Sequence, residues 1–446
     1  MDQAKLLDTL DWVLNEARSQ GADAADAVVF ESLSSGVEYR FGKLENLERS
    51  ESRDLGVRVF IGQKQAAVSS TDFSRPALKQ AVERAVAMAR LALEDPYCGL
   101  APREVLAAEW PDLDLEDRDE PSTERLTQMA LAAEGAALAV SGVTNSEGAS
   151  AGFGRSAIAL ATSEGFRGAY AGTSSSLSAG VVAGEGTGME RDYYGTYARF
   201  MSDLEGPEYV GQKAAERAVR RLGPRKIASQ SVPILFDPRV SMSMVNYFAS
   251  AIHGTSVARG TSFFKDRMGE KVLSDAVTII DDPHRVRGQR SRPFDGEGVA
   301  NQRMALAENG VLKSWLLDCS AARQLGLKTL GHAARGTGGP PSASTTNLYM
   351  APGRIPREDL LRGVKAGLYV VEMIGSGVNM VTGDYSRGAA GFWIENGEVT
   401  YPVSEITIAG NLKEMFLRIT PADDLTFRYG TNAPTLLIEG MTVAGA

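Results

Sequence analysis

Two Asn-Gly pairs, at residues 309–310 and 396–397, limit the folds open to this chain more than any other feature of its sequence. Asn and Gly tolerate the positive φ angles that both central positions of a two-residue β-hairpin turn require. The second pair lies between two short strand-like runs, residues 392–395 and 398–402. Each pair therefore predicts a hairpin, and together they predict that antiparallel sheet dominates the C-terminal half of the chain.

Helical periodicity marks other segments of the chain. Apolar residues recur at helical spacing over residues 6–17, and further helices are predicted near Pro76 and after the cap residue Ser122. Residues 27–70 and 142–200 instead show short apolar–polar alternations, which indicate antiparallel strands. The second of these regions is rich in Ser, Gly, Ala and Thr. Such small side chains suit tightly packed strands, and they could equally form one wall of a peptide channel.

A chain of 446 residues is too long for a single hydrophobic core, so two or three domains are expected. Residues 95–121 are rich in Pro, Asp and Glu, which is typical of a linker or of an extended crossing segment. The predicted fold class is α+β, with N-terminal modules of helices and antiparallel strands followed by a C-terminal domain dominated by antiparallel β-sheet. The predicted domains are an N-terminal α+β module at 1–100, a linker at 101–121, a second α+β module with small-residue hairpins at 122–228, and the mainly antiparallel β domain at 229–446.

The composition argues against several classes of function. The net charge is −9, and Lys and Arg are scattered along the chain, whereas nucleic-acid-binding proteins present clustered positive charge. No apolar run approaches the roughly 20 residues that span a bilayer. Cys98 and Cys319 lie far apart, and the first residues lack the basic and apolar parts of a secretion signal. We therefore expect a cytoplasmic protein that binds neither nucleic acid nor membrane.

A short polar run precedes the second hairpin and is predicted to be a glycine-rich loop. It consists of Gly383, Asp384, Tyr385, Ser386, Arg387 and Gly388. An acid, a phenol, a hydroxyl and a guanidinium in consecutive positions could bind a peptide-like ligand. The alternative is a well hydrogen-bonded surface turn, because Gly, Asp and Ser are also common turn residues.

Metal-binding motifs are sparse in the sequence. The chain has three histidines, which are His253, His284 and His332. Asp281, Asp282 and His284 could contribute to a metal site, but no second nitrogen or thiolate ligand lies within sequence reach. A turn that carries an exposed histidine is the alternative for this segment.

Nucleophilic and phosphate-binding motifs are missing as well. The one G-x-S-x-G match, at residues 148–152, lies in the region predicted to form successive hairpins and not at the strand-to-helix turn that a nucleophile elbow requires. Cys319 is interpreted as a structural residue, and Ser386 has no obvious base nearby. The glycine-rich run at residues 336–341 has no lysine after its glycines and is not followed by a helical pattern. We interpret it as a mobile loop that could cover a cavity.

Four long segments of the C-terminal half carry a more specific signal than any of these short motifs. They run over residues 278–284, 293–299, 315–333 and 383–411. Their content and order resemble the TldD/PmbA family, which comprises bacterial and archaeal peptidase-complex subunits once called modulators of DNA gyrase. The resemblance is closer to the PmbA (TldE) branch than to the TldD branch. It is strong over residues 230–446 and looser over the N-terminal half.

The resemblance implies that zinc is held by one of two subunit types. TldD subunits resemble zinc peptidases with an H-E-x-x-x-H helix, in which imidazoles hold Zn²⁺ and the Glu takes a proton from bound water, and with a later Cys ligand. At the matching helix positions this chain has Val245, Asn246 and Ser250, and residues 427–431 contain no cysteine. Val offers no lone pair, and Asn cannot accept a proton near neutral pH. We therefore expect no catalytic residue, no metal ligand and no cofactor in this chain, with zinc only in a TldD-type partner.

The leading hypothesis is a non-catalytic PmbA/TldE-like subunit of a TldD–PmbA metallopeptidase, which cuts unfolded or extended peptides, as in microcin maturation. The chain would pair with a TldD-type subunit, or with itself when isolated, and would form part of the substrate chamber. His332 and residues 383–388 are expected to contact peptide or partner. Two alternatives stay open: a homodimeric binding or scaffold protein with no role in proteolysis, and an enzyme with its own site around residues 384–387.

Overall fold

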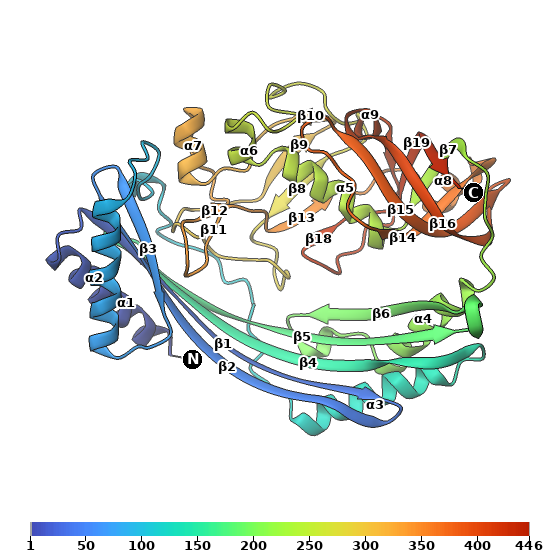
Figure 1. The fold of residues 1–446 in the computed structure, drawn as a ribbon, viewed down its shortest axis with the longest axis horizontal. Helices are drawn as coiled ribbons and strands as arrows, with labels where there is room; N and C mark the ends of the chain where they lie inside the picture. The colour runs from blue at the N-terminus through green and yellow to red at the C-terminus, as the bar shows by residue number, and fades with distance from the viewer. Residues whose placement is uncertain (1, 446) are drawn as a thin grey trace.

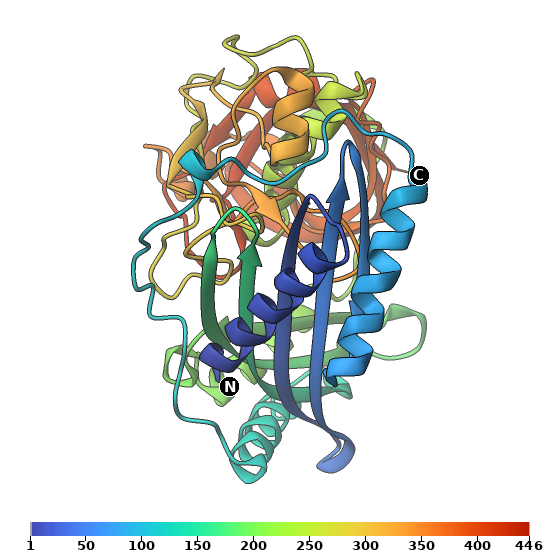
Figure 2. The same cartoon turned by 90° about the vertical axis from the view of Figure 1, so that its left-hand side faces the viewer.

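The computed structural model describes residues 2–445 and confirms the α+β class. A long curved sheet forms the N-terminal part of the molecule, and the C-terminal domain lies above this sheet in the view of Figure 1. Figure 2 shows the two N-terminal helices side by side on one end of the sheet. The two parts therefore face one another along the length of the sheet.

Six antiparallel strands form the N-terminal sheet, in the order β3-β2-β1-β4-β5-β6. Their bounds are Ala24–Arg40 for β1, Lys43–Ile61 for β2, Lys64–Ser70 for β3, Val143–Thr162 for β4, Arg167–Ala183 for β5 and Glu190–Ala198 for β6. Strand β1 pairs with β2 on one side and with β4 on the other. The strands of both predicted N-terminal modules therefore belong to one continuous sheet, which the sequence did not reveal.

Four helices cover this sheet, two near each end. Their bounds are Gln3–Ser19 for α1, Arg75–Leu91 for α2, Thr123–Leu138 for α3 and Pro207–Arg220 for α4. The buried stripe of α1, which includes Leu6 and Leu10, packs with α2 against β1–β3, whereas α3 and α4 bury a separate cluster at the other end. The predicted cap of α3 is confirmed, because Ser122 Oγ accepts a hydrogen bond of 3.2 Å from the Arg125 backbone N–H. No helix within residues 2–445 is both long and apolar enough to cross a lipid bilayer.

Residues 101–121 connect the two pairs of helices as an extended crossing segment. The segment contains a short 3₁₀ helix at Arg103–Val105. Leu106 forms an isolated bridge with Val299 of the C-terminal domain, and Leu115 O accepts a hydrogen bond of 2.9 Å from the Thr173 backbone N–H at strand β5. The segment therefore contacts both halves of the molecule along its course.

Two main sheets build the C-terminal domain. The larger has the order β16-β15-β14-β7-β19-β17, and a further pairing of β16 with β19 closes most of it into a barrel. The smaller has the order β10-β9-β8-β13-β18. Antiparallel pairs dominate, as predicted, although β7–β14 and β13–β18 are parallel. The strand bounds are Gln230–Phe236 (β7), Ile279–Asp282 (β8), Met304–Glu308 (β9), Val311–Leu312 (β10), Ala333–Ala334 (β11), Ser342–Ala343 (β12), Asn347–Met350 (β13), Ala366–Ile374 (β14), Asp384–Glu395 (β15), Glu398–Asn411 (β16), Ile419–Pro421 (β17), Thr431–Asn432 (β18) and Leu436–Ala444 (β19).

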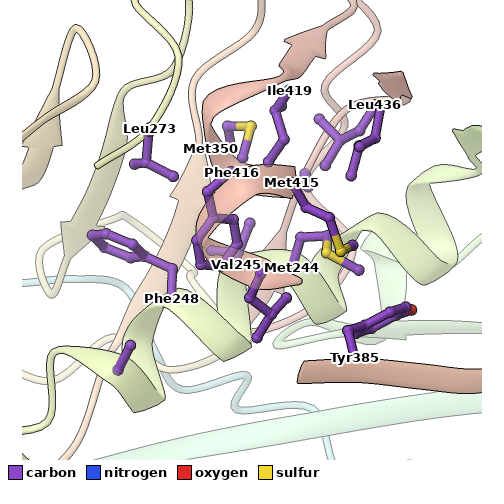
Figure 3. Close-up of a cluster of buried hydrophobic side chains, with 14 of the residues drawn as sticks. Met244, Val245, Phe248, Leu273, Met350, Tyr385, Met415, Phe416, Ile419 and Leu436 are labelled. Atoms are coloured by element: carbon purple, nitrogen blue, oxygen red, sulfur yellow. The ribbon is translucent and has the colours of Figure 1, made fainter. Parts of the chain in front are cut away.

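Helix α5 forms the centre of the C-terminal core. The helices of this domain are Pro238–Ala251 (α5), Gly254–Ala258 (α6), Cys319–Leu325 (α7), Arg357–Arg362 (α8) and Leu412–Leu417 (α9). Met244, Val245 and Phe248 of α5 are fully buried, and Figure 3 shows them packed beside Phe416 of α9. One side of α5 is therefore fixed by apolar packing, and its opposite side faces the N-terminal sheet.

The structure confirms both hairpins and corrects the loop predicted before the second one. Asn396 and Gly397, with φ angles of 50° and 84°, join β15 to β16, and the earlier Asn-Gly pair joins β9 to β10 in the same way. The prediction of a loop at residues 383–388 is wrong, because Asp384 already pairs with Asn411 as the first residue of β15. The polar residues at alternate positions lie on the outer side of a strand, and this pattern resembled a loop in the sequence.

The glycine-rich run at residues 336–341 contacts strand β2 through Thr337. A Cβ atom added to Gly56 of β2 would lie 2.4 Å from the Thr337 carbonyl oxygen. The Thr337 hydroxyl also donates a hydrogen bond to the Asp54 carboxylate. The absence of a side chain at Gly56 therefore allows the C-terminal domain to contact the sheet.

Candidate functional site

Helix α5 carries the three positions that match the zinc-binding helix of TldD subunits. Asp237 caps the helix by accepting a hydrogen bond of 3.1 Å from the Arg239 N–H, and Pro238 occupies its first turn. Val245 points into the core and is fully buried (Figure 3). Its aliphatic side chain has no atom that could bind a metal.

The other two motif positions are held by local hydrogen bonds. Asn246 Oδ1 accepts a hydrogen bond of 3.0 Å from the Thr431 hydroxyl, and Ser250 Oγ donates to the Asn246 carbonyl oxygen at 2.9 Å. Neither an amide nor a hydroxyl engaged in this way can act as a general base near neutral pH. Residues 2–445 contain no group of three or more His, Cys, Asp or Glu side chains placed to hold a metal ion.

A groove separates α5 from strand β6, the last strand of the N-terminal sheet. It consists of a cavity of about 420 Å³ and an adjacent cavity of about 450 Å³, which share Tyr193 and Arg239. The first cavity also contains Glu147, Arg191, Asp192, Arg221, Val240, Ser243, Val371, Glu372, Met373 and Arg387. The second also contains Gly195, Tyr197, Arg217, Met242, Gln289, Arg290, Arg428, Tyr429 and Gly430. We call the two cavities together the β6–α5 groove.

Ion pairs balance the charges of the first cavity. Arg239 donates two hydrogen bonds, of 2.8 and 3.0 Å, to the carboxylate of Asp192. Arg221 lies 3.3 Å from Glu190 and 2.5 Å from Glu372. Burial alone would raise the pKa of Asp192, but the hydrogen bonds and charge of Arg239 lower it below its usual range. Asp192 is therefore a carboxylate at neutral pH and holds Arg239 in place.

Of the polar run at residues 383–388, Arg387 reaches the groove. Its Nη1 donates a hydrogen bond of 2.5 Å to the Tyr247 hydroxyl of α5. Asp384 lies on the surface and accepts hydrogen bonds from the Thr382 hydroxyl (2.6 Å) and from Asn411 Nδ2 (3.1 Å), which lower its pKa. Ser386 is exposed at the next outward position of the strand. The structure thus separates these side chains instead of converging them on one point.

Tyr385, by contrast, belongs to the core. It is 2% exposed, and its hydroxyl lies 3.1 Å from the Met373 sulfur. Gly383 adopts a φ of 89°, and Gly388 pairs with Thr407 within the sheet. In this structure these three residues offer no side-chain group to the groove.

His332 is also buried and lies outside the groove. Burial lowers its pKa to about 4, with a smaller effect from the charge of Arg292. The other two histidines make separate hydrogen bonds, from the ring of His253 to Ala343 O at 2.9 Å and from the ring of His284 to Asn301 Oδ1 at 2.7 Å. The three imidazoles therefore do not form a common site.

A buried pair of carboxyl groups lies where the C-terminal domain meets the sheet. Glu297 Oε2 accepts a hydrogen bond of 2.8 Å from the Cys319 backbone N–H, and Asp295 accepts from the Glu297 and Val299 N–H groups. Burial, and next the charge of Asp295, raise the pKa of Glu297 to about 7. Burial also raises the pKa of the Cys319 thiol, so this cysteine is a poor nucleophile, in agreement with its structural interpretation.

Most groove residues were missed by the reasoning from sequence. Tyr193, Arg217, Arg290 and Arg428 come from four separate segments, and none belongs to a recognisable motif. The strand pattern near residues 192–200 did mark β6, but a pattern within one strand cannot show that its edge lies beside α5. Tertiary structure was needed to find this site.

Comparison with known proteins assigns every part of this architecture to one family. Three family profiles match the chain: PmbA/TldA metallopeptidase domain 1 at residues 25–89, the central domain at 116–222 and the C-terminal domain at 229–445. Metalloprotease PmbA of Escherichia coli O157:H7 is 40% identical over 99% of this chain and 97% of that protein. A PmbA homolog of Haemophilus influenzae is 36% identical over the same shares.

Solved structures show the same fold. A Bacteroides thetaiotaomicron protein described as a modulator of DNA gyrase superimposes with a TM-score of 0.92 and 28% identity, over the full length of both chains. TldE from Thermococcus kodakarensis superimposes with a TM-score of 0.87 at 19% identity, which shows likeness of fold alone; the match covers 98% of this chain and 100% of TldE. The curved sheet and the domain above it are thus the architecture of a metallopeptidase family. The chain belongs to that family, the PmbA/TldD family.

Proposed function

We propose that this chain is the non-catalytic, PmbA/TldE-like subunit of a cytoplasmic TldD–PmbA metallopeptidase. In this proposal it forms a heterodimer with a TldD-type subunit, which alone supplies the zinc. The chain contributes part of the chamber in which unfolded or extended peptides are cut, as in microcin maturation.

The chemistry of α5 is the observation that carries the proposal. A peptidase zinc site needs lone-pair ligands and a general base on its helix. At the matching positions Val245 is packed into the core and Asn246 is hydrogen-bonded to Thr431. These residues do not fit a zinc ion, so no step of hydrolysis is assigned to this helix.

The β6–α5 groove supports a role in substrate handling. It runs beside a sheet edge, and its volume of about 420 Å³ in one cavity and about 450 Å³ in the other suits a short extended peptide. Main-chain hydrogen bonds to a sheet edge hold peptides of many sequences, which fits a chamber subunit that accepts varied substrates.

Coexpression with a TldD-type subunit tests the proposal. We expect a stable mixed complex that contains zinc and cleaves an unfolded peptide, whereas the purified chain alone has neither zinc nor activity. A complex in which the motif Glu of the TldD-type subunit is replaced by Gln is the matched control, and it should assemble without cleaving.

Two results would contradict the proposal. Stoichiometric zinc together with peptide hydrolysis by the isolated chain would show that it has its own catalytic site. Homodimers that never assemble with a TldD-type subunit would instead favour a scaffold protein without a role in proteolysis.

A further inference from the structure

Strand β6 leaves one edge of the N-terminal sheet open at the groove. It pairs with β5, and the sheet order ends with it. The backbone carbonyl of Tyr193 accepts a hydrogen bond of 3.1 Å from Arg217 Nη1 of α4. The backbone N–H and C=O groups of Tyr193 therefore point away from β5. In an antiparallel strand the backbone groups alternate between the two sides. Gly195 and Tyr197 therefore point their N–H and C=O groups to the same open edge.

The backbone hydrogen bonds of the neighbouring strand β5 support this assignment. The backbone N–H of Thr173, just before the β5–β6 ladder, donates to Leu115 O on the side where β6 lies. Odd-numbered residues of β5 thus bond toward β6, where they meet the even-numbered residues of β6. Within residues 2–445, no hydrogen bond from outside the sheet reaches the backbone of Gly195 or Tyr197.

Aromatic rings and arginines surround this open edge. Tyr193 and Tyr197 are 63% and 45% exposed, and the ring of Tyr197 lies 6.1 Å from that of Tyr429 across the cavity. The cavity of about 450 Å³ at this point is lined by four arginines and, among the described residues, by no Asp or Glu. An extended segment laid on β6 would therefore meet a positively charged, aromatic surface.

Among the described residues, two of the four arginines have no carboxylate partner. Arg239 is paired with Asp192, and Arg428 donates a hydrogen bond to the Glu205 carboxylate. Arg217 instead donates to the Tyr193 carbonyl, and the ion pairs within residues 2–445 leave Arg290 without a carboxylate. The cavity therefore has an excess of positive charge although the whole chain carries a net charge of −9.

We propose that β6 binds an extended acidic peptide segment as an added strand. The backbone of the segment pairs with Gly195 and Tyr197, and its carboxylates form charge-assisted hydrogen bonds with Arg217 and Arg290. The carboxylates come from Asp or Glu side chains or from a free C-terminus. This inference rests on the proposed function for its place in a substrate chamber, and it names acidic segments as the class of peptide that this subunit selects.

Fluorescence anisotropy with the full-length chain tests the inference. The probe is a labelled, unstructured ten-residue peptide in which Glu alternates with Val and Thr. We expect it to bind at least about tenfold more tightly than the same peptide with Gln in place of Glu, since each 1.4 kcal/mol is a factor of ten. A C-terminal amide version distinguishes side-chain from terminal carboxylates. A backbone N-methylated version should bind weakly if strand addition is correct.

Charge-removing variants give the second arm. Arg217→Gln and Arg290→Gln should each lower the affinity for the Glu peptide about fivefold or more, because one charge-assisted hydrogen bond is lost. The affinity for the Gln peptide should be unchanged. Arg84→Gln, at an exposed arginine on α2, is the matched control and should bind like the parent protein. Unchanged circular dichroism and thermal midpoints would show that the variants remain folded.

The outcomes separate this inference from the proposed function. Equal affinity for the Glu and Gln peptides, or no loss in the Arg217→Gln/Arg290→Gln double variant, would overturn the inference even if the chain still assembles with a TldD-type subunit. Acid-selective binding by a chain that never assembles with such a subunit would leave the β6 site intact and contradict the proposed function.

Discussion

Arg335 of the C-terminal domain lies with its Nη1 2.6 Å from Oδ1 of Asp26 on strand β1. Arg58 of β2 donates to the same carboxylate, with 3.2 Å from its Nε to Oδ2. The side chains of Arg335 and Asp26 are 2% and 1% exposed. Burial would raise the pKa of Asp26, but the two guanidinium groups more than offset it and hold the pKa below its usual range. A buried ion cluster thus joins the sheet to the C-terminal domain.

Replacement of Asp26 by Asn tests this cluster. The variant removes the carboxylate that both buried guanidinium groups contact, and breaking a buried ion pair lowers the free energy of unfolding by about 3–5 kcal/mol. We expect the urea midpoint of unfolding to fall accordingly. Glu164→Gln, which removes the partner of Arg103 in an exposed ion pair of 2.9 Å, is the control and should cost about 1 kcal/mol or less. Similar small losses in both variants would show that the buried cluster contributes little.

Stability should depend on pH through Glu297. Its pKa is raised from 4.5 to about 7 in the folded protein, so the protonated carboxyl favours the folded state. This contribution is complete below about pH 4.5 and is lost as the pH rises through 7. In Glu297→Gln the amide oxygen can still accept from the Cys319 N–H. We expect the variant to match the parent near pH 5 and to exceed its unfolding free energy by about 1–3 kcal/mol at pH 8.

Urea unfolding at several pH values measures this difference. Glu104→Gln, at an exposed glutamate, serves as the control and should follow the parent at each pH. Parallel pH curves for the parent and Glu297→Gln would contradict the assignment of the raised pKa to Glu297.

Gly56→Ala should weaken the contact between strand β2 and the loop at residues 336–341. The new Cβ would lie 2.4 Å from the Thr337 carbonyl oxygen, so the loop must move. We expect the free energy of unfolding to fall by about 1–3 kcal/mol and amide hydrogen exchange in the loop to become faster. Gly36→Ala on β1 is the matched control, because its nearest neighbour, Ala151 O, is 3.7 Å away. Identical exchange in the two variants would argue against this contact.

The aromatic ring of Tyr385 should contribute to the stability of the fold, whereas its hydroxyl should contribute little. The hydroxyl faces the weakly accepting sulfur of Met373, so Tyr385→Phe should change the unfolding free energy by about 0.5 kcal/mol or less. Tyr385→Ala removes a buried aromatic ring and should cost about 3–5 kcal/mol. Peptide binding by the Phe variant should equal that of the parent. A loss of peptide binding in the Phe variant would instead support a functional site at residues 384–387.

Local sequence signals predicted much of the fold. The periodicity of α1, the cap at Ser122 and the Asn-Gly turn at residues 396–397 each depend on neighbours within a few positions, and each is confirmed. The length of β2 was missed. Residues 43–51 are exposed on both faces of the strand, so no alternation of apolar and polar side chains marks them.

The candidate site depended on contacts that no local pattern encodes. Arg387 was singled out from the sequence and does line the groove, whereas Tyr385 in the same run turned inward. Tyr385 and Arg387 lie on the same face of β15, because they are two positions apart, so strand alternation does not separate them. The long side chain of Arg387 reaches the Tyr247 hydroxyl of α5, whereas the ring of Tyr385 is buried in the core. Arg217 and Arg290 come together only when α4 and the loop after β8 are placed around β6.

The continuity of the N-terminal sheet has a consequence for how the protein is made. Strand β1 pairs with β4 from Asp26 to Tyr39, although more than a hundred residues of chain separate the two strands. On the ribosome, the hairpin of β1 and β2 therefore carries a bare edge until residue 162 has emerged, and a bare edge readily pairs with other nascent chains. Translation speed across α3 and the crossing segment should accordingly influence the yield of folded protein.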